Sequence, residues 1–211
     1  VPATEGTTAG TVQDPQSGMW VGAAARVRLG RSLVLCCQGP GIKIYRGELE
    51  AEGNTIAFAS RGANVVANGG KVMLRANEIK GALGDGVSSW NNSHLSLDAN
   101  RIHANSGAGI AINTGGGAVN ITKNLVFDNC CSAVLFATSQ TKQATLSGND
   151  LERNAAGGVQ GLHQVTGQRS LHQQRRRSGG VRVRFSPPPP LPPQPAAPSH
   201  GATSSSPAAA Q

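Results

Sequence analysis

Residues 72–159 decide the fold, because they carry one sequence pattern in four successive copies. Each copy opens with two apolar residues one position apart and places an asparagine three residues after the second. A small residue followed by valine or isoleucine closes the copy. The copies are VMLRANEIKGALGDGV (72–87), LSLDANRIHANSGAGI (95–110), VNITKNLVFDNCCSAV (119–134) and ATLSGNDLERNAAGGV (144–159). From copy to copy, both the asparagines and the small residues are spaced 23, 24 and 25 residues apart, which indicates stacked structural repeats.

The period of the repeat selects the class of fold. Short runs of alternating apolar and polar residues, separated by Gly, Asn and Ser, indicate two or three short strands in each copy. A unit of this length is too short for two packed helices, and its leucine order does not fit a leucine-rich repeat. It fits one coil of a parallel β-helix, in which successive coils stack about 4.8 Å apart. We therefore predict an all-β solenoid of about five to six coils.

Stacking places equivalent residues of successive coils above one another, so the repeat also predicts the core. Three aliphatic columns point inward. They are Leu74, Leu97, Ile121 and Leu146; Ile79, Ile102, Val126 and Leu151; and Val87, Ile110, Val134 and Val159.

The asparagine columns are predicted to be structural. Asparagine tolerates left-handed backbone, and its amide both donates and accepts hydrogen bonds, so stacked copies can bond from coil to coil. One predicted ladder contains Asn77, Asn100, Asn124 and Asn149. A second, interrupted by Ala82, contains Asn105, Asn129 and Asn154.

The chain divides into three predicted segments. Residues 1–41 are an N-terminal segment, partly disordered, with room for a partial coil. Residues 42–162 are the coils; the first, 42–66, is degenerate, with Gly47 in place of the marker asparagine. Residues 163–211 form a disordered, basic, Pro/Ala/Ser-rich tail. Because no initiator methionine or cap sequence is seen, the chain resembles a fragment. The sharp change in composition suggests a tail foreign to the repeat protein, for instance through an altered reading frame, and the sequence alone leaves both points open.

Charge and cysteine content narrow the functional classes. The net charge is +8, but residues 1–152 hold 12 Lys/Arg and 11 Asp/Glu, so the excess lies in the tail. We therefore do not expect nucleic-acid binding, and no apolar run is long enough to span a membrane.

The adjacent pairs Cys36-Cys37 and Cys130-Cys131 have no zinc spacing and are predicted to be small buried apolar residues, with a disulfide between the pairs left open. The sequence indicates neither a compartment nor an oligomeric state.

Residues NRIHANSGAGIAINTGGG (100–117) and VNITKNLVFDN (119–129) resemble the right-handed parallel β-helix repeats of the pectate-lyase-like superfamily. They are most similar to the carbohydrate-binding and sugar-hydrolase type repeats of β-helical F-box proteins, where an N-x-I coil precedes a G-I-x-I-x-T-G turn. The resemblance covers about residues 42–162 and implies a right-handed, single-stranded parallel β-helix. It does not select a function, because this fold carries lyases, hydrolases, epimerases and binding scaffolds.

The outward positions hold the candidate site residues. Lyases of this fold use a calcium-binding carboxylate cluster with a basic residue, and hydrolases use paired aspartates. No such column is present in the sequence, so no metal site and no cofactor are predicted, and Ca²⁺ is expected only for an enzyme. The weak catalytic candidates are Arg101, His103 and Asp98. The binding candidates are Trp90, Glu78, Arg101 and Asp150, with Glu78 over Arg101 predicted as a solvated charge ladder.

Two functional hypotheses follow. The first is a recognition scaffold that presents its flat outward faces to a protein or polysaccharide partner, as part of a larger adaptor. The second is a polysaccharide-active enzyme, that is, a lyase, hydrolase or epimerase. The absence of stacked carboxylates from the sequence favours the scaffold.

Overall fold

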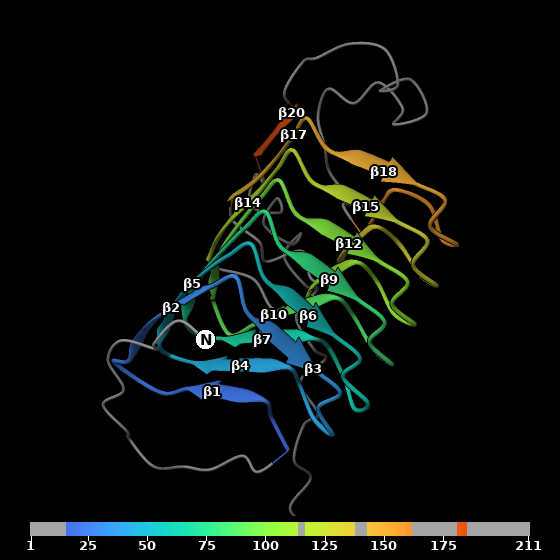
Figure 1. Ribbon diagram of the computed structural model, residues 1–211. Coiled ribbons are helices and arrows are strands. Elements are labelled where there is room, and N and C mark those ends of the chain that lie inside the picture. Colours follow the sequence, from blue (N-terminus) through green and yellow to red (C-terminus); the bar gives the residue numbers. More distant parts are fainter. Residues whose placement is uncertain (1–15, 114–116, 138–142, 162–180, 185–211) are drawn as a thin grey trace, which may run out of the picture.

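The computed structural model describes residues 16–113, 117–137, 143–161 and 181–184, and in these residues the chain forms a β-solenoid (Figure 1). Each coil contributes one strand to each of three sheets, which are named A, B and C in the order in which the chain visits them. Six complete coils follow one another, and β19 begins a further one. The predicted all-β parallel solenoid is confirmed.

The strands of sheet A are β1 (Met19–Val21), β4 (Ile42–Tyr45), β7 (Val65–Asn68), β10 (Val87–Trp90), β13 (Ile110–Ile112), β16 (Val134–Phe136) and β19 (Val159–Gln160). The strands of sheet B are β2 (Arg26–Gly30), β5 (Glu48–Glu52), β8 (Lys71–Arg75), β11 (His94–Asp98), β14 (Ala118–Thr122), β17 (Gln143–Ser147) and β20 (Val181–Arg184). The strands of sheet C are β3 (Leu33–Leu35), β6 (Thr55–Ala57), β9 (Glu78–Lys80), β12 (Arg101–His103), β15 (Leu125–Phe127) and β18 (Asp150–Glu152).

All neighbouring strands pair in parallel, apart from β20, which pairs antiparallel with β17. The register matches the repeat: Leu97 pairs with Leu74 and Ile121, and Ile102 pairs with Ile79 and Val126. The three predicted apolar columns are thus confirmed. Their members in the first three copies are fully buried, whereas Leu146, Leu151 and Val159 are half-buried at the end of the core.

The coils begin earlier than residue 42. Strands β1, β2 and β3 form a complete first coil within the segment for which the sequence predicted only a partial one. The predicted phase of residues 42–66 is wrong. Ile42 pairs with Val65 in sheet A, and Thr55 pairs with Glu78 in sheet C, so the marker asparagine of this coil is Asn54 and not Gly47. The same Ile-x-Ile pattern occurs in strands of sheet A, so this pattern alone does not fix the phase of a coil.

Most of the predicted disordered tail, residues 163–180 and 185–211, lies outside the described residues. Val181–Arg184 is the exception, because it forms β20 against the last strand of sheet B. The tail therefore contributes at least one strand, which its composition did not indicate.

The first asparagine ladder is longer than predicted, and its inner members use both the donor and the acceptor of their amides. Asn100 shows the arrangement: its Oδ1 accepts hydrogen bonds from the backbone N–H and the Nδ2 of Asn77, at 2.9 and 3.0 Å. Its own N–H and Nδ2 donate to Asn124 in the next coil, and Nδ2 also donates to the carbonyl of Leu74 at 2.8 Å. The same pattern joins all five members, which are Asn54, Asn77, Asn100, Asn124 and Asn149.

The left-handed backbone lies beside these asparagines and not at them. The residue before each ladder position has positive φ, as at Ala76 (52°) and Ala99 (54°), whereas the ladder asparagines do not. Our prediction that asparagine itself takes the left-handed conformation at this corner is wrong. The side chain is needed for its amide, and the turn is made by its neighbour.

The second ladder joins Asn105, Asn129 and Asn154 in the same way. At the predicted interruption, the N–H of Ala82 donates to Asn105 Oδ1. The missing amide is supplied by Asn64, whose Nδ2 donates to the same Asn105 Oδ1 at 3.2 Å and to the carbonyl of Lys80 at 2.9 Å. Asn64 comes from a different turn position, 41 residues before Asn105.

Candidate binding surfaces

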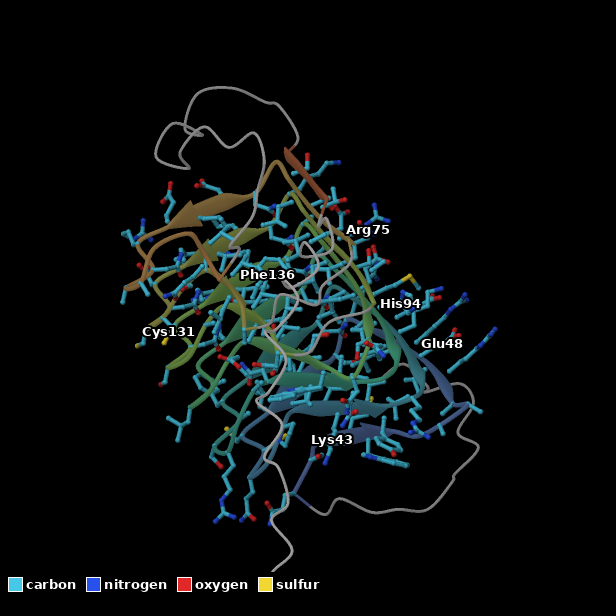
Figure 2. All side chains as sticks on the ribbon, turned by 180° about the vertical axis from the view of Figure 1, so that it is seen from behind. Lys43, Glu48, Arg75, His94, Cys131 and Phe136 are labelled. Carbon is cyan, nitrogen blue, oxygen red and sulfur yellow. The ribbon has the colours of Figure 1, made fainter. Side chains whose placement is uncertain are left out.

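The candidate binding surfaces among the described residues are the outward faces of the three sheets. Within the described ranges, no three His, Cys, Asp or Glu side chains come close enough together to hold a metal ion. No helix among the described residues is long and apolar enough to cross a membrane. The inward faces are filled by the aliphatic core, with Phe136 inside and residues such as Arg75 and His94 pointing outward (Figure 2).

On sheet A, Trp90 is the main exposed aromatic residue, with 41% of its surface accessible. Its indole Nε1 donates to Ser88 Oγ at 3.0 Å, which draws the side chain back along its own strand. Asn113, in the next coil, donates through Nδ2 to the same hydroxyl at 2.7 Å. Ser88 itself is buried, at 4% exposure. The hydrogen bond to Ser88 therefore fixes the orientation of the Trp90 indole.

Trp90 belongs to an outward column of uncharged residues. Tyr45 pairs with Asn68, and Asn68 pairs with Trp90. Asn113 follows β13 at the next level, where its N–H donates to Ser89 O. Aromatic and amide side chains therefore alternate along the solenoid axis at the coil spacing of about 4.8 Å. Tyr45 was missed in the sequence because the phase of its coil was assigned wrongly.

Sheet C gathers three of the predicted site residues in one column. Glu78, Arg101 and Asp150 lie in register, with Leu125 between the last two. The predicted Glu78–Arg101 charge ladder is not formed. Glu78 instead accepts a hydrogen bond from Lys80 Nζ at 2.9 Å and lies 3.3 Å from His103 Nε2. These contacts, mainly the hydrogen bond from Lys80, lower the pKa of the Glu78 carboxyl below its ordinary value.

Phe127 organises the neighbouring contacts on sheet C. Its ring stacks on that of His103, with the centroids 4.6 Å apart. The guanidinium groups of Arg101 and Arg153 each lie 5.5 Å from the Phe127 centroid. Arg153 is held by Asp128 through two hydrogen bonds, of 2.8 and 3.1 Å, and this lowers the pKa of the Asp128 carboxyl. His103 is therefore fixed between Glu78 and Phe127, a role that its sequence position did not indicate.

Asp98, the third weak catalytic candidate, lies on a different face. It is the last residue of β11 in sheet B, where it accepts a hydrogen bond from Thr122 Oγ1 at 2.9 Å and lies 3.9 Å from Arg75 Nε. The structure therefore brings Arg101 and His103 together on sheet C and leaves Asp98 on sheet B. These three residues do not make one site.

The cysteines are at the surface, so the prediction of buried cysteines is wrong. Cys36, Cys130 and Cys131 are exposed and Cys37 is half-buried, and all four are free thiols (Figure 2 shows Cys131). A disulfide between the pairs is excluded by geometry. The pairs lie in the first and the fifth coil, about 19 Å apart at the coil spacing, whereas a disulfide requires Cα atoms within about 7 Å.

The parallel register, the inward aliphatic columns and the asparagine ladders define a β-solenoid protein. Within that class, the model of the right-handed beta helix region matches residues 8–160, and the chain belongs to this family. No curated protein and no solved structure is detectably similar to the chain. Membership is consistent with the pectate-lyase-like resemblance of the repeat, and the β-helix fold supports a scaffold or a polysaccharide-active family in general.

Proposed function

We propose that the chain is a recognition scaffold that binds a neutral polysaccharide along the outward face of sheet A. The observation that carries the proposal is Trp90, held in place by its hydrogen bond to Ser88 and bordered in register by Asn68. Aromatic faces stack on the apolar faces of sugar rings, and amides bond to their hydroxyl groups. Side chains that are ordered before binding lose less conformational entropy when the ligand arrives.

The shape and the charge of the column agree with this ligand. A linear glycan can run along the solenoid axis, because the coil spacing is close to the length of one sugar ring. Tyr45 and Trp90 lie two coils apart, which places an amide between the two aromatic residues. The four side chains of the column are uncharged, and the nearest cation is the Arg46 guanidinium, 5.3 Å from the Tyr45 ring centroid. We therefore expect preference for a neutral over an acidic chain at the Trp90 end of the column.

The test is calorimetric titration of the full chain with neutral glucan and mannan oligosaccharides and with oligogalacturonate. We expect binding of a neutral oligosaccharide that Trp90→Ala weakens about tenfold or more. Aromatic anchor residues carry a large share of the binding energy, and a loss of about 1.4 kcal/mol is a tenfold change in affinity. Leu83→Ala is the control, since Leu83 is an exposed apolar residue in the turn between β9 and β10, outside the column, and should leave the affinity unchanged. Failure of every oligosaccharide to bind contradicts the proposal.

The same samples test the enzyme hypothesis. Chromatography of the oligosaccharides after long incubation reports any shortened product. Shortened chains whose formation is abolished by Glu78→Gln or His103→Ala favour a polysaccharide-active enzyme, because these two side chains form the closest carboxylate–imidazole pair among the described residues. Intact oligosaccharides with Trp90-dependent affinity support the scaffold.

A further inference from the structure

We propose that the outward face of sheet C is a self-complementary surface on which two copies of this chain pack. Three successive rungs of the sheet carry a basic, an apolar and an acidic pair of side chains. They are Arg101 and His103 on β12, Leu125 and Phe127 on β15, and Asp150 and Glu152 on β18. This proposal does not depend on the one made for sheet A.

The register makes the three rungs one continuous surface. Arg101 pairs with Leu125, which pairs with Asp150, and His103 pairs with Phe127, which pairs with Glu152. The inward residue of each strand is aliphatic and belongs to the core, so the two other side chains of each strand face outward. Figure 1 shows these strands stacked along one side of the solenoid. The surface is thus two residues wide, with Arg101 at one end, the apolar rung in the middle and Asp150 at the other end. His103 already contacts Glu78, and Glu152 already contacts Arg153 at 3.0 Å. The charge complementarity of the surface is therefore carried by Arg101 and Asp150.

A two-fold axis that runs along β15 in the plane of contact matches this surface with itself. The rotation keeps the strand direction and reverses the order of the coils. Arg101 then faces Asp150 of the second copy, His103 faces its Glu152, and Leu125 and Phe127 face their own equivalents. An interface of this kind is isologous, because each contact occurs twice. The other in-plane axis, along the solenoid, would place Arg101 against His103 and is disfavoured.

The neighbouring side chains are compatible with this arrangement. Asp128, beside Phe127, would approach its own equivalent, but each copy already neutralises it with the two hydrogen bonds from Arg153. The guanidinium of Arg101 lies against the Phe127 ring and has no ion pair among the described residues. It is therefore a cation already oriented beside the apolar rung, and apolar centres bordered by charged pairs are typical of specific interfaces.

The test is sedimentation of the full chain over a concentration series in the micromolar range, with exchanged charges. We expect dimers of the native chain that weaken as the salt concentration rises. Arg101→Asp alone should raise the dimer dissociation constant about tenfold or more, because it faces Asp150 with like charge, and Asp150→Arg alone should do the same. An equimolar mixture of the two variants should dimerise again, since each then faces the opposite charge.

The controls separate association from folding. Arg75→Asp makes the same charge change on sheet B, where Arg75 is exposed, and should leave dimerisation unchanged. Far-ultraviolet circular dichroism and the melting temperature verify that each variant is folded. A native chain that stays monomeric throughout the series, or a mixture that associates no better than the separate variants, overturns the proposal.

Discussion

The two asparagine ladders border the same sheet C but are built differently. The first, from Asn54 to Asn149, places one asparagine at the same position of five successive coils. The second lacks an asparagine at Ala82 and recruits Asn64 from another turn. In both ladders the backbone N–H and the side-chain donor of one coil end on the amide oxygen of the next. The corner therefore requires an amide at a point in space, and the sequence position that supplies it can change.

The largest loss of stability is expected when an asparagine in the middle of the first ladder is replaced. Asn100→Ala removes the acceptor of two Asn77 donors and the donors to Leu74 O and Asn124 Oδ1. All of these groups are buried, so water replaces few of the bonds. We expect the free energy of unfolding to fall by about 3–5 kcal/mol, measured by urea denaturation.

The control for this change is Asn92→Ala, at an exposed turn position. It removes the same amide from a site with positive φ, and we expect a loss below about 1 kcal/mol. Equal losses for Asn100→Ala and Asn92→Ala would show that the ladder amides are not what stabilises the corner.

The second prediction removes the Asn64 amide from the second ladder and then introduces an asparagine at position 82 in its place. Asn64→Ala should cost about 2–3 kcal/mol, because Asn105 Oδ1, Lys80 O and the N–H of Ala59 lose a partner. Ala82→Asn alone should also destabilise, since the Asn64 amide already lies there. The double variant should lose less than the sum of the single ones, as a shared site predicts.

Urea denaturation of the four proteins in this cycle gives the coupling energy directly. Strictly additive losses would mean that Asn64 and the amide introduced at position 82 do not compete for one place.

The sequence repeat predicts those features of the fold that recur from coil to coil. The inward columns and the regular ladder were predictable, because Leu97 and Asn100 must recur at each coil to stay in contact with their equivalents. Asn54 was missed although it stands 23 residues before Asn77, since Ile42-Lys43-Ile44 suggested another phase. Asn64 leaves no periodic signal, because its contact with Asn105 spans an irregular turn.

The outward contacts depend on competition between flexible side chains. The column correctly placed Glu78 beside Arg101, yet Glu78 bonds to Lys80 and His103 while Arg101 turns to Phe127. Similarly, nothing in the order of Ser88 and Trp90 reveals that one hydroxyl accepts bonds from Trp90 and Asn113. Register fixes which residues are neighbours, and rotamers decide which of them touch.

A third prediction concerns a carboxylate that takes the role of a ladder amide. Asp85, in the turn from sheet C to sheet A, accepts the N–H of Ala108 through Oδ1 at 2.9 Å. Burial raises the pKa of the Asp85 carboxyl above its ordinary value, more than this hydrogen bond lowers it. The ionised form is thus disfavoured in the folded state, and stability from this group increases as the pH falls through its folded pKa.

Asp85→Asn keeps the acceptor and removes the charge. It should therefore stabilise the protein at neutral pH, by less than Asn64→Ala destabilises it, and the gain should shrink as acid protonates the native carboxyl. Thermal unfolding of both proteins from neutral to acidic pH measures this difference. A gain that grows in acid would contradict the expected direction of the pKa shift.

The smallest effect is expected at the residue that makes the turn beside the first ladder. Ala99 holds a φ of 54°, a conformation that costs an alanine about 1 kcal/mol or more relative to glycine. Glycine also gives up more backbone entropy on folding, so Ala99→Gly should stabilise by only about 0.5 kcal/mol. Ala111→Gly, in the extended strand β13, carries the same entropy cost without relief of strain and should destabilise. Opposite signs in parallel urea titrations would show that the residue before each ladder asparagine is constrained by its backbone alone, whereas the asparagine is required for its amide.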